Sequence, residues 1–313
     1  MTPGARAAHL RAMERKTSMD SAGAALLIGC ALLFGLNNVT IKVANGGFQP
    51  LFQAGLRSLG AVALIGLWMA LRGIPLPRPG VFRRGGLLIG LFFTGEFLCL
   101  YIALDLTTVT RASIVFYSMP VWLALAAHVL LPGERLSAVR LSGLALAMAG
   151  VAWALLDRPG GGAAAPSLLG DVLALAAAMF WAGIPLVIRL TGLARERAET
   201  QLFCQLAVSA PLFLGLAALG GPLLRDPALV HVAAVVYQFA VVASVVFLVW
   251  FWLISIYPAS AVASFSFLTP VASVALGWWL LDEPVGPGIL GALALVAAGL
   301  YLVNRPARAP TPA

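Results

Sequence analysis

Charged residues are scarce in this sequence. Only 10% of its 313 residues are charged and 61% are hydrophobic, whereas a typical soluble domain has about 25% charged and about 45–50% apolar residues. A water-soluble fold of this size could not bury that excess, so much of its surface would stay apolar. The composition therefore excludes a soluble enzyme, a disordered chain and a nucleic-acid-binding domain, although the net charge is +8. It indicates a protein that crosses a membrane many times.

Catalytic and metal-binding motifs are also absent from the sequence. It has no HExxH, no GxSxG and no Walker-type phosphate loop. Its three cysteines, Cys30, Cys99 and Cys204, lie inside apolar segments and imply neither a disulfide framework nor a metal cluster. We therefore expect no metal, no cofactor and no enzymatic activity. Any active transport would have to draw on an ion or solute gradient.

Ten apolar segments occupy most of the chain. Each is close to the roughly 20 residues that a helix needs to cross about 30 Å of hydrocarbon, and Gly, Pro and charged residues separate them. The predicted fold class is an all-α membrane protein with ten transmembrane helices. The predicted spans are Ala22–Ile41, Leu51–Leu71, Gly86–Leu104, Ala112–Leu131, Val139–Leu156, Leu168–Ile188, Thr200–Leu219, Val230–Ser255, Ser260–Leu281 and Pro287–Val303.

The basic residues support this number of spans and predict an orientation. With ten spans, 15 of the 20 Lys and Arg residues fall on the side that carries both tails. Only Lys42, Arg111, Arg158 and Arg225 fall on the other side, and Arg57 lies within a span. Because cytoplasmic loops carry an excess of Lys and Arg, we expect a multi-pass protein of the bacterial inner membrane with both termini in the cytoplasm.

The chain also repeats itself. Phe34–Lys42 resembles Trp181–Arg189, and Pro120–Glu134 resembles Pro270–Glu283, at offsets of 147 to 150 positions. Each repeat contains five spans, an odd number, so the second repeat must insert in the opposite sense. Inverted repeats recur in secondary transporters, with the substrate near the midplane at the repeat interface. The predicted organisation is a tail (1–21), a first five-helix repeat (22–157), a linker (158–167), a second five-helix repeat (168–304) and a tail (305–313).

Several motifs stand in a recognisable order along the chain. They are Leu33–Lys42, Arg57, Thr110–Pro120 and the Pro–Glu pairs that close the two halves. Together they resemble the EamA branch of the drug/metabolite transporter superfamily, over nearly all of the chain. The resemblance implies a transporter. Known members export amino acids and other small metabolites, and more distant ones carry nucleotide sugars or phosphorylated sugars, so the resemblance does not select a substrate.

Glu96 is the most informative single residue. It lies about ten positions into the third span, near the bilayer midplane, where a carboxylate costs at least a few kcal/mol unless it is protonated, paired or hydrated. We expect it to face a central cavity and to contact substrate or couple a proton. The alternative is a structural partner for Arg57, which lies at a similar depth. Arg57 itself could hold a substrate carboxylate through a bidentate fork or lock its helix to a neighbour.

Five further residues are candidates for the substrate site. Asn37 and Asn38 are adjacent, so they point about 100° apart on a helix. One can face the cavity while the other bonds to a neighbouring helix. Tyr117, Trp181 and Gln238 lie inside spans, and aromatic walls suit an amphipathic organic solute better than a bare ion.

Two prolines are candidates for gating. Pro120 and Pro270 occupy matching positions in spans four and nine, where each frees a carbonyl group and permits bending. Glu134 and Glu283 follow at the ends of these spans, where we expect them to meet water and to shape turns.

These features predict a secondary transporter that exports small organic metabolites, with amino acids as the favoured class, by alternating access. Proton antiport through Glu96 and uniport down a gradient both fit the sequence. The small multidrug members of the superfamily carry a coupling Glu in the first span, where this chain has Asn37 and Asn38, so their mechanism is not carried over. The alternatives are a carrier of drugs, nucleotide-like or sugar-derived solutes, and a receptor or assembly protein that transports nothing.

The expected partners are a small-molecule substrate and the lipid bilayer, and no nucleic acid. Two small-residue spacings, Gly86 to Gly90 and Gly143 to Ala147, predict close helix packing. This packing is expected within the chain, and it is also compatible with a homodimer.

Overall fold

The computed structural model describes residues 19–131, 136–157, 167–257, 262, 265 and 267–303. Within these residues ten apolar helical segments follow one another, which confirms the predicted fold class. Eight of them have the length and composition to cross a membrane, and two shorter apolar helices, Leu268–Leu281 and Pro287–Val303, complete the series.

The helices of the first half are α2 (Ser21–Asn45), α3 (Pro50–Leu71), α4 (Pro79–Val81), η1 (Phe82–Gly86), α5 (Leu87–Leu106), α6 (Val109–Phe116), α7 (Met119–Leu130) and α8 (Ala138–Leu156). The helices of the second half are α9 (Leu168–Leu190), η2 (Leu193–Arg195), α10 (Ala198–Leu219), α11 (Leu229–Val236), η3 (Tyr237–Val246), α12 (Phe247–Ile256), α14 (Leu268–Leu281) and α15 (Pro287–Val303).

Local sequence signals account for several helix starts. The Asp20 carboxylate accepts the backbone N–H of Gly23 at 2.8 Å and so caps α2. Pro50 and Pro79 lie in the first turns of α3 and α4, where the missing N–H has no helical partner to lose.

Two spans differ from the sequence prediction. The third was expected to begin at Gly86, but α4, η1 and α5 run without a break from Pro79. Arginines at 83 and 84 do not end this helix, since their apolar stems can follow it while the charged ends reach the polar boundary. The fourth span is divided, because α6 ends at Phe116 and α7 begins at Met119. Most of the predicted start of the ninth span, and Glu134, lie outside the described residues.

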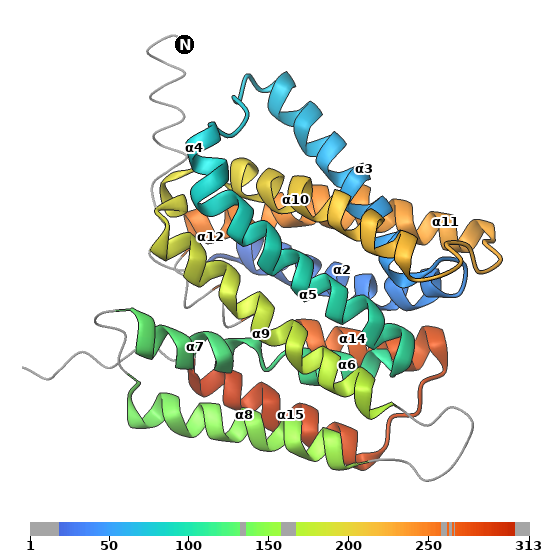
Figure 1. Cartoon of the computed structure of the whole chain (residues 1–313). Coiled ribbons are helices and arrows are strands. Elements are labelled where there is room, and N and C mark those ends of the chain that lie inside the picture. Colours follow the sequence, from blue (N-terminus) through green and yellow to red (C-terminus); the bar gives the residue numbers. More distant parts are fainter. Residues whose placement is uncertain are drawn as a thin grey trace, which may run out of the picture.

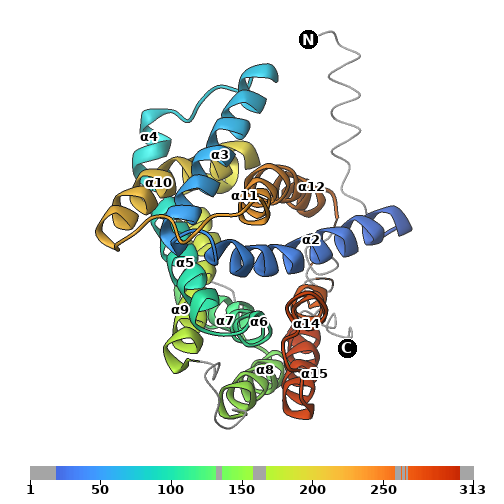
Figure 2. The same cartoon turned by 90° about the vertical axis from the view of Figure 1, so that its right-hand side faces the viewer.

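The two halves pack against each other through corresponding helices. α8 packs along α15 and α3 along α10, and these are the fifth and second spans of each half. Figures 1 and 2 show α8 beside α15 at one edge of the bundle, with α3 and α10 toward the other edge. The other extensive contacts between the halves also match, since α5 packs on α9 as α2 packs on α11 and η3, and α2 packs on α14 as α9 packs on α6 and α7. Exchanging the halves therefore reproduces the main helix pairs.

Corresponding helices run antiparallel. A Cβ atom on Gly143 would lie 2.8 Å from the carbonyl oxygen of Gly299, and one on Gly150 would lie 2.7 Å from that of Ala292. Positions thus rise along α8 while they fall along α15. Only glycine permits such close approach of two backbones.

The predicted small-residue spacings are used inside the chain. Ala147 faces Gly299 in the same seam between α8 and α15, and Gly86 and Gly90 face Cys204 and Val208 of α10. The homodimer remains a prediction.

Candidate functional site

A central cavity lies between the two halves. Its volume is about 400 Å³, within the range of roughly 300–1,000 Å³ found for small-molecule sites. Helices of both halves line it, and most of the lining is apolar. Nine aromatic side chains contribute: Phe34, Phe93, Phe97, Phe116, Tyr117, Trp181, Phe247, Trp250 and Phe251.

One face of α5 supplies much of this wall. Phe93, Glu96, Phe97 and Leu100 all line the cavity, and their spacing of i, i+3, i+4 and i+7 places them on a single helical face. Glu96 is 4% exposed. The glutamate predicted from sequence therefore lines the cavity, on the same helical face as Phe93 and Phe97.

Arg57 reaches the same cavity from α3. It is fully buried, and its guanidinium carbon lies 4.0 Å from the ring centre of Phe97 and 5.7 Å from that of Phe93. In the described part of the chain, none of its three guanidinium nitrogens has a hydrogen-bond partner. The alternative of a close ion pair with Glu96 is not observed, because no pair within 4.0 Å forms between them. Buried donors without partners are rare, so Arg57 presents unused hydrogen-bonding capacity.

Two amide groups at the cavity share this property. The Oδ1 atom of Asn37 and the Nε2 atom of Gln205 are buried without a hydrogen-bond partner among the described residues, and both residues line the cavity. Gln205 was not among the sites predicted from sequence. It lies 148 positions after Arg57, so the repeat offset alone could have identified it as the counterpart of Arg57.

Asn38 plays a different part from its neighbour. Its Nδ2 atom donates to the hydroxyl oxygens of Ser113 on α6 and Ser273 on α14, each at 3.2 Å. It therefore ties α2 to both halves while Asn37 keeps an open acceptor. Tyr117, Trp181 and Pro120 also line the cavity.

Gln238 and Pro270 do not line the cavity. Gln238 accepts a hydrogen bond from the Tyr101 hydroxyl at 2.7 Å and donates to Oε1 of Gln53 at 3.2 Å. Gln53 donates in turn to Asn45, whose Nδ2 donates to the carbonyl oxygen of Tyr101 at 3.1 Å. These four side chains close a buried ring that joins α2, α3 and α5 to η3. Pro270 is the third residue of α14 and follows Thr269, which does line the cavity.

Polar contacts hold the halves together at one end of the bundle. We call the end that carries Arg72, Arg78 and Arg195 the basic end; the other is the opposite end. At the opposite end the carboxylate of Glu283 accepts the backbone N–H groups of Val109 and Thr110, the first residues of α6, at 2.7 and 2.9 Å. Glu283 is only 5% exposed. The expectation that it meets water is wrong, because α6 of the first half covers it, whereas its backbone N–H does bond to the carbonyl oxygen of Gly277 in the turn after α14.

Further contacts cross between the halves at this end. Arg111 of α6 pairs with Asp171 of α9 at 2.9 Å, and both side chains are buried. Arg225 pairs with Asp105 at 2.8 Å in a more exposed position. The Lys42 ammonium donates to the carbonyl oxygens of Leu104 and Thr107, within the first half. Together with the buried ring of Gln238, these contacts close the opposite end.

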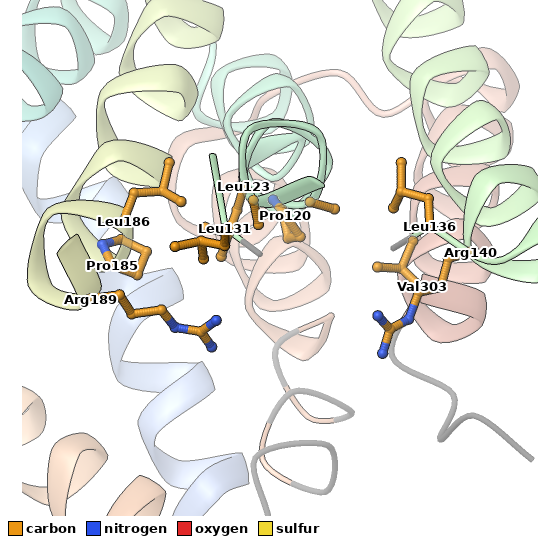
Figure 3. A pocket seen from close by; sticks show the side chains of 11 residues that line it. Pro120, Leu123, Leu131, Leu136, Arg140, Pro185, Leu186, Arg189 and Val303 are labelled. Carbon is orange, nitrogen blue, oxygen red and sulfur yellow. The ribbon is translucent and has the colours of Figure 1, made fainter. Parts of the chain in front are cut away.

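The basic end contains a second, smaller cavity of about 210 Å³. It adjoins the central cavity, since Pro120, Leu123 and Pro185 line both. Figure 3 shows Arg140 and Arg189 approaching it from two sides. The polar lining of the central cavity is therefore separated from the basic end by a mostly apolar passage, and from the opposite end by bonded side chains.

Sequence comparison identifies the family of this chain. The model of the EamA-like transporter family matches residues 21–156 and again 168–305. The chain belongs to the EamA-like transporter family. The resemblance inferred from the motifs is thereby confirmed, with one match in each half.

Relatives of this EamA-like protein are similar over almost their whole length. A probable amino-acid metabolite efflux pump of Escherichia coli is 29% identical over 290 residues, covering 89% of this chain and 92% of the relative. The uncharacterized transporter YvbV of Bacillus subtilis is 27% identical over 301 residues, covering 91% and 92%. A solved crystal structure with 22% identity covers 91% of this chain and 98% of its own, with a TM-score of 0.65. The similarity to this solved structure shows only that the two folds are alike.

Proposed function

We propose that this EamA-like transporter is a secondary carrier that exports small organic metabolites, with amino acids as the favoured class, from a bacterial cytoplasm across the inner membrane. The observation that carries the proposal is the central cavity, where Arg57, Gln205 and Asn37 keep buried polar atoms without partners. A dry structural core would satisfy such atoms. A site that binds and releases a polar solute keeps them available. The efflux activity named for the Escherichia coli relative agrees with this direction.

Transport would proceed by alternating access. The antiparallel packing of corresponding helices, such as α8 with α15, is the relation expected if the second repeat inserts upside down. Each half could then adopt the conformation of the other, which gives two states of similar energy that open to opposite sides. The present conformation is closed at the opposite end. With both termini in the cytoplasm, its cavity would accept substrate from the cytoplasm.

The break in span four would allow this movement. α7 begins with Met119 and Pro120, and α14 begins two residues before Pro270. Because α6 and α7 are separate helices, the outer and inner parts of this span can tilt independently. We propose Pro120 and Pro270 as gating positions on this basis.

Transport in reconstituted vesicles tests the function. Purified protein in proteoliposomes should carry labelled amino acids down a concentration gradient, and empty vesicles should not. If an imposed pH gradient drives accumulation, proton antiport operates, and the flux that Glu96→Gln retains should no longer depend on the pH gradient. If flux ignores the pH gradient, the protein is a uniporter. Absence of flux for amino acids and for other metabolite classes, with folded protein, contradicts the proposed function.

A further inference from the structure

The polar groups that line the central cavity differ in charge and in the direction of hydrogen bonding. Arg57 offers a cation with three free nitrogens, and Gln205 offers an amide N–H group. Glu96 offers a carboxyl group, and Asn37 offers a carbonyl oxygen. Donors and acceptors thus occur as two pairs, and each pair contains one ionisable and one neutral group.

The donor pair is suited to a carboxylate. The guanidinium carbon of Arg57 lies over the Phe97 ring, 4.0 Å from its centre. This cation–π contact uses none of the N–H donors, which have no hydrogen-bond partner among the described residues. Gln205 is 3% exposed on α10, the helix that packs along α3. Two forked oxygens would therefore receive one group from each half of the protein.

The acceptor pair is suited to an ammonium group. An –NH₃⁺ group carries three donors and no acceptor, so it needs oxygen atoms such as those of Glu96 and Asn37. Glu96 and Arg57 line one cavity without pairing with each other within 4.0 Å. A ligand that carries both a carboxylate and an ammonium group would complement both residues.

We propose that the cavity binds its substrate as a zwitterion, with Arg57 and Gln205 holding the carboxylate and Glu96 and Asn37 holding the amine. Gln205 is thereby a specificity-determining residue. The inference rests on the proposed transport function and deepens it, since it states which charges the substrate must carry. The aromatic walls, including Tyr117 and Trp181, would receive an apolar side chain.

A matched set of ligands separates the two ends of the site. L-phenylalanine carries both charges, phenethylamine lacks the carboxylate, and 3-phenylpropanoate lacks the amine. L-leucine, isoamylamine and 4-methylpentanoate form the same set with an aliphatic side chain. Binding to protein in lipid nanodiscs should be about tenfold or more weaker when either charge is lost, as expected for a hydrogen bond to a charged group.

Variants assign the loss to named residues. Gln205→Met keeps the length of the side chain and removes its amide. It should weaken binding of the zwitterion and the carboxylate about fivefold to tenfold, and leave the amine unchanged. Glu96→Gln should weaken the zwitterion and the amine, and leave the carboxylate unchanged. Gln201→Met is the matched control, because Gln201 lies one turn earlier on α10 and bonds to the carbonyl groups of Leu193 and Glu196 instead.

Several results would overturn this inference. Equal affinity for all three members of both sets contradicts it, as does failure of both zwitterions to bind folded protein. A Gln205→Met variant that weakens all three ligands alike assigns Gln205 a structural role instead. Transport measurements distinguish a failure of this inference from a failure of the proposed function. A wild-type protein that transports phenethylamine as well as phenylalanine is a carrier without this charge selection, whereas a protein that transports no metabolite is not a carrier.

Discussion

At the opposite end of the bundle, several buried polar side chains of one half bond to the other half, whereas at the basic end an apolar-walled cavity lies between the halves and the Tyr257 hydroxyl donates to Asp20 across them at 2.6 Å. Glu283, Arg111 and Gln238 all reach across at the opposite end. Pro120, Leu123 and Pro185 surround the passage at the basic end. Among the described residues, the fully buried polar contacts between the halves thus gather at the opposite end, and this difference indicates which way the conformation faces. Removing contacts at the closed end should cost stability, and removing side chains at the open end should cost little.

The largest effect is expected from the buried ion pair. Asp171→Asn leaves the cation of Arg111 buried without a compensating charge, which costs about 3–5 kcal/mol. The free energy of unfolding, measured by steric trapping in bicelles, should fall by that amount. Arg225→Gln is the matched comparison, because its pair with Asp105 is half exposed and should contribute less than about 1 kcal/mol. Equal losses for the two variants would show that burial does not distinguish these pairs.

The buried ring should come second. Gln238→Leu leaves the Tyr101 hydroxyl and Oε1 of Gln53 without a partner, at a cost of about 1–3 kcal/mol. The same unfolding measurement checks it. Because Gln238 does not line the cavity, the Gln238→Leu variant should bind a transported substrate with an affinity within about twofold of the wild-type value. The affinity is measured in the conformation that is closed at the opposite end. A large loss of affinity without loss of stability would show that Gln238 contributes to the substrate site, as its sequence position suggested.

Substitution of Glu283 should change the proportion of the two transport conformations more than it changes the free energy of unfolding. Glu283→Gln keeps the shape but removes the charge that accepts the two N–H groups at the start of α6, which weakens the contact by about 1–2 kcal/mol. The opposite end should then open more often. Faster reaction of a cysteine introduced at Thr110 with a membrane-impermeant thiol reagent would report this. An unchanged rate would mean that this contact does not close the end.

The smallest effect is expected at the basic end. Arg140 borders the smaller cavity at the protein surface, so Arg140→Gln should change the free energy of unfolding by less than about 0.5 kcal/mol. A loss comparable with that of Gln238→Leu would show that Arg140 makes a strong polar contact at the basic end, and would contradict the contrast between the ends.

Hydropathy, the internal repeat and the mid-span polar residues were sufficient to predict the ten helical segments and several of the residues that line the cavity. Arg57, Glu96, Asn37 and Trp181 are polar or aromatic residues at mid-span positions, and such residues are costly unless they face a cavity or a partner. The sequence did not distinguish those two outcomes. The Tyr101 partner of Gln238 lies 137 residues away in the chain, and only the folded structure brings them together.

Glu283 is a second residue whose surroundings depend on a segment that is distant in the chain. A carboxylate just after an apolar span looks like a surface residue, yet the start of α6, more than 170 residues away, supplies its partners and covers it. The division between α6 and α7 was also not predicted from sequence. A proline such as Pro120 is favourable in the first turn of a new helix and also occurs at a bend within one helix, and the sequence alone does not distinguish these two cases. Only for Gln205 did the sequence hold an unused signal, in its offset from Arg57.

Distances between spin labels at both ends test the central claim of alternating access most directly. Leu156 and Leu229 are exposed positions on the two halves at the opposite end, and Leu71 and Leu190 are exposed positions on the two halves at the basic end. In lipid nanodiscs we predict two populations at each end, with Glu283→Gln lengthening the distance at the opposite end and shortening it at the basic end. One fixed distance at each end, unchanged by Glu283→Gln and by a transported substrate, would contradict the account.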